Sequence, residues 1–253
     1  GTLTFGAGKI SAGILYVGYQ PAANPKYGVG TVNVNGGTLS VSTNLTLGFT
    51  SGDTGAATTS GTLNINNGAV QANTIAAGSG TSVINLTDGT LSVTNTLGAS
   101  GAAVGTLSSS DSAMILSIPN GTPGAVVDTL NLGGTTNIIS IGSISATVLA
   151  YPAVLPIITY ATLSGSFNLG LISLPSPYVG FISNDVANGS VDLVVTSGPA
   201  PPRSITWSGR DANNGNALTS VWDIGATADW LSNSTPVTYN DNGGLGGDVV
   251  TLD

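Results

Sequence analysis

The sequence contains no cysteine and no histidine, and all of its acidic residues are aspartates. Without cysteine, the chain has neither disulfides nor thiolate metal ligands. Without histidine, it lacks the general base of a Ser-His-Asp triad. We therefore expect packing and backbone hydrogen bonds to stabilise the fold.

Positive charge is also scarce, since Lys and Arg together number 4 and the net charge is −8. The basic residues are Lys9, Lys26, Arg203 and Arg210. Four scattered cations do not form the basic stripe that phosphate neutralisation requires. This excludes nucleic acids and anionic membrane surfaces as partners.

Long apolar runs are missing as well. The longest candidate, residues 146–163, is interrupted by Pro152 and Pro156 and is shorter than the roughly 20 residues of a membrane helix. We therefore expect no membrane insertion. The chain begins with Gly1, without a methionine or a positively charged leader, so we expect a piece of a longer protein or a processed start.

The residues that are present favour strands and turns. The chain has 37 glycines, many Ser, Thr and Asn residues, and apolar residues that are mostly Val, Leu, Ile and Ala. With 41% hydrophobic residues and a mean hydropathy of +0.33, it has enough apolar side chain for a long core. We expect a folded all-β protein.

Three internal repeats indicate the architecture: residues 30–48, 61–78 and 82–98. Each contains an alternating strand, a turn, a second alternating strand and a third short apolar segment that ends on glycine. The turns are Asn35-Gly36-Gly37, Asn67-Gly68 and Asp88-Gly89. Three brief strands per unit are typical of one coil of a parallel β-helix, or β-solenoid.

The spacing of the turn glycines agrees with such coils. Gly68 and Gly89 are 21 residues apart, and the longer interval from Gly37 to Gly68 contains a polar loop over residues 49–60. At this spacing, residues 1–200 would form roughly eight to ten coils, which would stack about 4.8 Å apart.

An antiparallel meander is the structural alternative, because Asn-Gly and Asp-Gly are hairpin signals. The parallel arrangement is favoured because inward positions stay aliphatic and outward positions are mostly Thr, Ser and Asn in all three copies. Such regularity lets like residues stack from coil to coil. On this interpretation Asp88 is a turn residue.

The composition divides the chain into three parts. Residues 1–197 are the expected β-solenoid, although the repeat becomes irregular after residue 105. Residues 198–203 contain three prolines within four positions and are expected to form an extended linker. Residues 204–253 hold all three tryptophans and are expected to form a small β-rich segment.

The motif Gly-Gly-Thr-Leu-Ser-Val, followed by Leu-Thr-Leu-Gly, resembles the autotransporter-associated β-strand repeats of bacterial surface proteins. Residues 155–196 look like the end of one passenger unit, and residues 207–253 look like the start of the next. The resemblance implies export, a right-handed parallel β-helix and display at the cell surface. It implies no particular chemistry, and the chain shows no translocating barrel.

Parallel β-helices also include polysaccharide lyases and hydrolases, so an enzyme is an alternative. Glycoside hydrolysis needs two carboxylates about 5 to 10 Å apart. The aspartates of residues 1–197 are well separated in sequence, and no arginine precedes Arg203. We therefore expect no catalytic residues, no enzymatic activity and no cofactor.

The aspartates of the last segment are candidate calcium ligands, because calcium binds carboxylate oxygens in loops. They are Asp211, Asp223, Asp229, Asp241 and Asp248. Their spacing matches no calcium-binding loop, so we expect solvated loops and no metal site.

Two sets of residues are candidates for glycan contacts. Trp207, Trp222 and Trp230 would form a sugar-stacking platform or, as the favoured alternative, an apolar cap. The sequons Asn-X-Ser/Thr mark glycosylation candidates at Asn44, Asn85, Asn120, Asn188 and Asn233.

The sequence thus predicts a secreted structural or adhesive protein of the cell surface or of an extracellular filament, without catalytic activity. The alternative is a carbohydrate-binding or polysaccharide-degrading β-helix protein. Expected partners are a longer repetitive chain, other copies of the same chain, and surface glycans.

Overall fold

The computed structural model describes residues 1–253 except 22–27, 52–58, 212–216, 219–226, 241–246 and 252–253. The described residues form strands and turns and contain no helix, as the composition predicts. They divide into two compact units. The first comprises Gly1–Ala146 and Val154–Thr196, and the second comprises Thr147–Ala153 and Ser197–Asp253.

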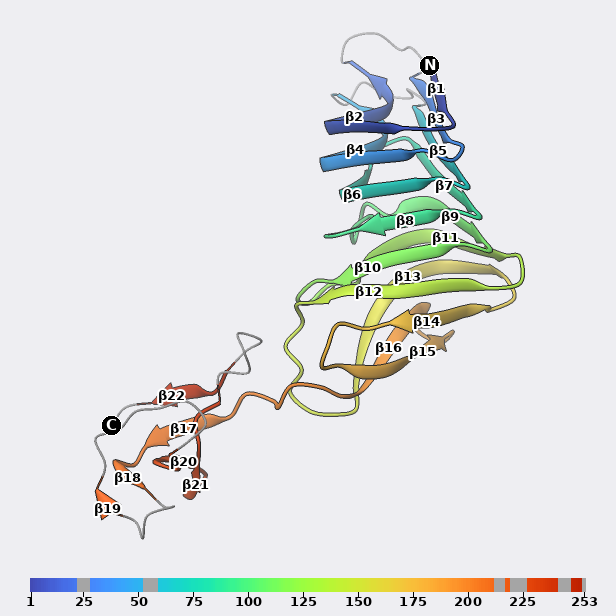
Figure 1. The fold of residues 1–253 in the computed structure, drawn as a ribbon. Helices are drawn as coiled ribbons and strands as arrows, with labels where there is room; N and C mark the ends of the chain where they lie inside the picture. Colours follow the sequence, from blue (N-terminus) through green and yellow to red (C-terminus); the bar gives the residue numbers. More distant parts are fainter. Residues whose placement is uncertain (22–27, 52–58, 212–216, 219–226, 241–246, 252–253) are drawn as a thin grey trace. The chain divides into compact units, whose positions relative to one another are not determined.

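Two sheets of mostly parallel strands make up the first unit (Figure 1). The first sheet has 9 strands in the order β1-β3-β5-β7-β9-β11-β13-β16-β15. Its strands are β1 (Thr2–Phe5), β3 (Val29–Val34), β5 (Ser60–Asn66), β7 (Thr81–Thr87), β9 (Val104–Ser110), β11 (Ala125–Gly133), β13 (Ala153–Gly165), β15 (Val179–Asp185) and β16 (Ser190–Ser197).

The second sheet has 7 strands in the order β14-β12-β10-β8-β6-β4-β2. Its strands are β2 (Lys9–Gln20), β4 (Thr38–Thr50), β6 (Ala69–Ala77), β8 (Thr90–Val93), β10 (Ala113–Ile118), β12 (Asn137–Ile144) and β14 (Leu169–Ser173). Up to β14 the chain alternates between the sheets, and each strand pairs in parallel with the strand two places along the chain. The parallel pairing overturns the meander alternative.

The first sheet has nine strands and the second has seven, whereas eight to ten coils are expected over residues 1–200. The expected count assumed 21-residue coils, whereas Ser60 pairs with Thr81 after 21 residues but Ala125 pairs with Ile158 only after 33. In the repeat over residues 82–98, β8 ends at Val93 and the expected third strand is only an isolated bridge at Leu97. In the repeat over residues 30–48 the expected third strand is not separate. It is the second half of β4, whose register with β6 shifts between Val41 and Asn44.

At each corner where the chain passes from the first sheet to the second, a single residue adopts the left-handed backbone conformation. Asn67, Asp88 and Asp111 have φ of 52°, 49° and 51° and lie between β5 and β6, β7 and β8, and β9 and β10. Asn and Asp tolerate this conformation better than other non-glycine residues. Asp88 is therefore the expected turn residue, but the turn changes sheets and does not form a hairpin.

The core lies between the two sheets and consists of aliphatic columns. Leu63, Ile84, Leu107 and Leu130 stack at one register position of the first sheet and are fully buried. On the second sheet Leu39, Val70, Leu91, Met114 and Ile139 form a similar column. Each fully buried side chain of this size contributes about 1.5–3 kcal/mol.

The second unit contains short strands. Its 4-stranded sheet has the order β21-β20-β17-β22, formed by β17 (Ser204–Trp207), β20 (Trp230–Ser232), β21 (Thr235–Val237) and β22 (Val249–Thr251). A separate pair joins β18 (Arg210–Asp211) to β19 (Ala217–Leu218). The proline-rich residues 198–203 belong to this unit, as do Thr147–Ala153.

Candidate functional site

The outer face of the first sheet carries a row of hydrogen-bonded amides. Nδ2 of Asn33 donates to Oγ1 of Thr4 at 2.8 Å, and Nδ2 of Asn64 donates to Oδ1 of Asn33 at 2.8 Å. Nδ2 of Asn85 continues the row to Oδ1 of Asn64 at 2.9 Å. These residues occupy one register position, so the stacking of the strands creates the row.

This register position continues with short polar residues. Ser108 pairs with Asn85, Asn131 pairs with Ser108, and Ser164 pairs with Asn131. Nδ2 of Asn131 donates to Oγ of Ser108 at 3.2 Å. The whole column is uncharged and offers amides and hydroxyls to the solvent.

A shallow groove of ≈ 400 Å³ follows this column across β7, β9, β11 and β13. Its outward-facing lining comprises Asn85, Thr87, Ser108, Ser110, Asn131 and Ser164. Gly133 and Gly165 line its β11 and β13 end, where no side chain fills the space. The groove therefore runs across the strands, along the direction in which they stack.

Aspartates stand beside one rim of the groove. Asp88 and Asp111 directly follow the lining residues Thr87 and Ser110, and both are exposed. Oδ1 of Asp111 accepts hydrogen bonds from N of Thr135 at 2.7 Å and from its Oγ1 at 2.9 Å. The hydrogen bonds from Thr135 and its neighbour lower the pKa of Asp111, so this carboxylate is ionised at neutral pH.

A buried amide network lies at a corner of the first unit. Asn137 is fully buried, and its Nδ2 donates to O of Gly133 and to Oδ1 of Asn168, both at 2.9 Å. Its Oδ1 accepts from Oγ of Ser109 at 2.8 Å and from N of Ser112 at 3.3 Å. The side chain thus satisfies all of its polar groups and connects β9 with the segment before β14. The sequence analysis missed this network.

The tryptophans lie in the second unit. Trp230 is fully buried, and its ring contacts Trp207 edge-on at a centroid distance of 5.1 Å. Tyr239 also packs against Trp230, at a centroid distance of 5.9 Å. Trp222 lies outside the described residues. Trp230 therefore belongs to the core of its unit and exposes no ring face on which a sugar could stack.

A cluster of exposed aromatic side chains lies on β2 and β4 of the second sheet. Tyr16 and Tyr19 are 45% and 48% exposed, and both contact Phe49, with centroid distances of 5.1 and 5.8 Å. Tyr16 is aligned with Thr46, so the aromatic ring replaces a small polar residue of the next copy. This departure from the repeat is the sequence signal that could have identified the cluster.

The five sequons fall in two environments. Asn120, Asn188 and Asn233 are exposed in turns. Asn44 and Asn85 are half-buried in strands, and their Nδ2 atoms donate to Oγ1 of Thr46 and to Oδ1 of Asn64. A glycan on either strand residue would therefore replace a structural hydrogen bond.

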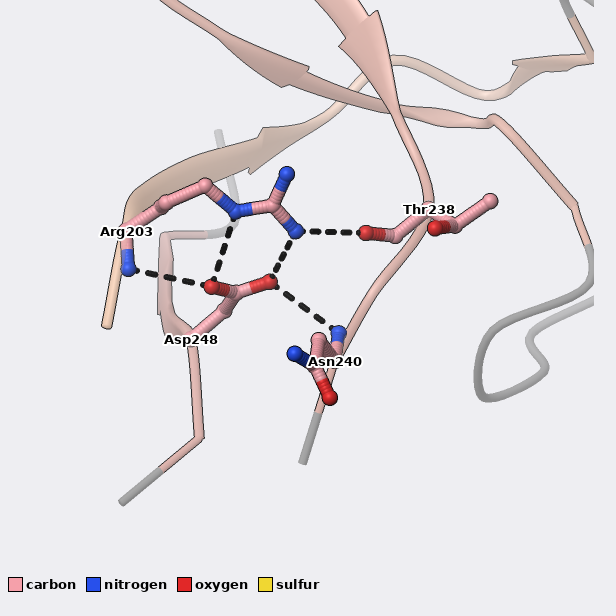
Figure 2. Close-up of polar contacts among 4 residues, drawn as sticks. All are labelled: Arg203, Thr238, Asn240 and Asp248. Atoms are coloured by element: carbon pink, nitrogen blue, oxygen red, sulfur yellow. Dashed lines mark hydrogen bonds and ion pairs between the residues drawn. The ribbon is translucent and has the colours of Figure 1, made fainter. Parts of the chain in front are cut away.

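An ion pair holds the second unit together (Figure 2). Nε and Nη2 of Arg203 donate to the two carboxylate oxygens of Asp248 at 3.1 and 2.7 Å. The backbone N atoms of Arg203 and Asn240 also donate to this carboxylate, each at 3.0 Å, and Nη2 reaches O of Thr238 at 2.8 Å. Asp248 is buried and joins three segments of the chain.

The contacts of Asp248 determine its protonation. Burial raises its pKa, but the hydrogen bonds from Arg203 and Asn240 and the positive charge of Arg203 outweigh burial and leave the pKa below its ordinary value. A lowered pKa in the folded state stabilises the fold above the unfolded-state value of about 4, and this stability is lost as the pH falls below it.

Acidification below about pH 4 is therefore expected to loosen the second unit. Asp248→Asn should lower the free energy of unfolding of this unit by about 2 kcal/mol at pH 7 and remove most of the acid effect. Tryptophan fluorescence measures this unit selectively, because all three tryptophans lie after residue 203. The control is Asp128→Asn, at an exposed position of β11; equal behaviour of the two variants would contradict the assignment.

The other candidate calcium ligands are not brought together in the described residues. Asp229 is buried beside Trp230, Asp223 and Asp241 lie outside the described residues, and Asp248 binds Arg203. Within the described part of the chain, no group of three or more acidic side chains is placed to hold a metal ion. Among the same residues, no helix has the length and apolar character needed to cross a membrane.

Comparison of the chain with protein-family models, with curated proteins and with solved structures finds no match.

Proposed function

We propose that the chain is a segment of a secreted structural or adhesive protein without catalytic activity, and that its first unit is a right-handed parallel β-helix. The strand pairing supports the helix. Up to β14, successive strands alternate between two parallel sheets, and the partners on each sheet are one repeat apart. A chain that winds as a helix produces this pairing.

The observation that carries the structural role is the contrast between the two faces of the sheets. Inward columns are aliphatic and fully buried, whereas outward columns are rows of Asn, Ser and Thr that bind one another. The amides and hydroxyls of such a face bind water without charge, and similar side chains recur from coil to coil. These properties suit a rod that spaces or displays other parts of a surface protein.

The proposal includes contact with further coils of the same kind. β1 and β2 are the outermost strands at one end of the two sheets, and Leu3, Ile14 and Tyr16 on them are exposed. An edge strand has unpaired backbone groups, and these apolar side chains add area that a further coil would bury. The added coil would come from a longer repetitive chain or from a second copy.

Export and surface display rest on the resemblance to autotransporter-associated repeats, together with the uncharged outer face. The tryptophan platform of the carbohydrate-binding alternative is not part of the proposal, because Trp230 is buried.

Immunoelectron microscopy of the native material tests this proposal. Antibodies against the chain are expected to label extended rods or filaments outside intact cells. Labelling that requires permeabilised cells would contradict export. The same protein should release no reducing or unsaturated sugar from a panel of plant and microbial polysaccharides. Release that an aspartate substitution abolishes would contradict the non-catalytic assignment.

A further inference from the structure

The groove across β7, β9, β11 and β13 has no role in a purely structural rod. We propose that it binds a neutral polysaccharide chain that lies along the stacking direction of the strands. The inference goes beyond the structural function, because a rod without a ligand needs no such groove.

The direction of the groove favours a chain of repeating units. Its outward side chains recur at one register position per strand, from Asn85 through Ser108 and Asn131 to Ser164. Neighbouring strands are about 4.8 Å apart, which is close to the length of one pyranose unit in an extended polysaccharide. Each sugar is therefore able to meet an equivalent set of polar atoms.

The chemistry of the lining favours sugar hydroxyls. The side chains are amides and hydroxyls, which both donate and accept hydrogen bonds. In the part of the chain that the structure describes, the hydroxyls of Thr87 and Ser164 have no protein partner. The side chains that face the groove include no large apolar or aromatic anchor of the kind that dominates protein–protein interfaces.

The charge of the site favours an uncharged ligand. None of the lining residues is charged, while Asp88 and Asp111 stand beside the rim. The chain as a whole carries a net charge of −8. An acidic polysaccharide would be repelled and would find no basic partner in the groove.

Two substitutions fill the groove without changing the core. Thr87→Arg places a long side chain at an exposed outward position of β7. Gly133→Gln adds a side chain on β11, where a Cβ would meet Ser110 at 3.6 Å and O of Ser109 at 3.9 Å, both ordinary contact distances. Thr2→Arg is the matched control, because Thr2 is exposed on β1 of the same sheet and does not line the groove.

The test is calorimetric titration of the whole chain with soluble xyloglucan, galactomannan and laminarin, and with polygalacturonate as the acidic comparison. At least one neutral polysaccharide is expected to bind, and Thr87→Arg and Gly133→Gln should each weaken it roughly tenfold or more. Thr2→Arg should bind as the unchanged chain does. Circular dichroism and thermal unfolding show that each variant is folded.

Failure of all three neutral polysaccharides to bind would overturn the inference. So would equal binding by the groove variants and the control, or tighter binding of polygalacturonate. None of these results would affect the structural proposal, which depends on surface labelling and on the absence of sugar release. Conversely, release of sugars with intact groove binding would overturn only the non-catalytic assignment.

Discussion

Gly48→Ala is expected to lower the free energy of unfolding of the first unit by about 3 kcal/mol or more. Gly48 has φ of 66°, and a Cβ there would lie 2.6 Å from the carbonyl oxygen of Thr81 and 3.1 Å from C of Gly80. Its own carbonyl accepts a hydrogen bond from N of Gly80 at 2.9 Å. The end of β4 thus packs backbone against backbone on the start of β7, and a methyl group would separate them.

Gly101→Ala isolates the contribution of the backbone conformation. Gly101 has φ of 79°, but nothing lies within 4 Å of an added Cβ. This variant should cost only the left-handed penalty of about 1–2 kcal/mol. Urea unfolding followed by far-UV circular dichroism gives both values, while the tryptophan fluorescence of the second unit should not change. Equal costs for the two variants would mean that the close approach at Gly48 does not matter.

Asn137→Ala is expected to destabilise the first unit by about 3–4 kcal/mol. The substitution removes Nδ2, which donates two hydrogen bonds, and Oδ1, which accepts two, from a fully buried site. It leaves Oγ of Ser109 and N of Ser112 without this acceptor in the interior, and each unsatisfied buried group costs about 1–3 kcal/mol. Urea denaturation at pH 7 measures the change.

Asn131→Ala is the matched control, because Asn131 is also an amide on a strand but is half-buried and donates a single hydrogen bond at 3.2 Å. It should cost about 0.5–1 kcal/mol. If water entered the Asn137 site and satisfied its partners, the two variants would cost the same, and the buried network would not be a major source of stability.

The regular part of the first unit could be predicted from its sequence because inward and outward residues alternate along its strands. Alternation assigns Leu63 and Ile84 to the interior and Asn64 and Asn85 to the surface, and the structure confirms this. The sheet change at Asp88 was harder to foresee. A residue with positive φ serves both a hairpin and a corner, and only the pairing partner of the next strand distinguishes the two.

The surfaces were less predictable, because they depend on which residues meet across strands. Trp230 was a candidate for ligand contact, but a unit with few residues needs its largest side chain for its own core. Asn137 follows Gly133-Gly134-Thr135-Thr136, a composition typical of exposed turns, and nothing local shows that Ser109 and Asn168 will surround it. The groove depends on the absence of side chains at Gly133 and Gly165, which becomes visible only when β11 and β13 lie side by side.

The row of amides on the first sheet gives the first unit a polarity. Asn85 donates to Asn64, Asn64 to Asn33 and Asn33 to Thr4, so every amide dipole in the row points the same way along the stack. Aligned dipoles strengthen one another and add along their common direction. Two such units joined end to end would preserve that alignment only if both ran in the same direction. Units lying side by side would have the lower dipole–dipole energy if they ran in opposite directions.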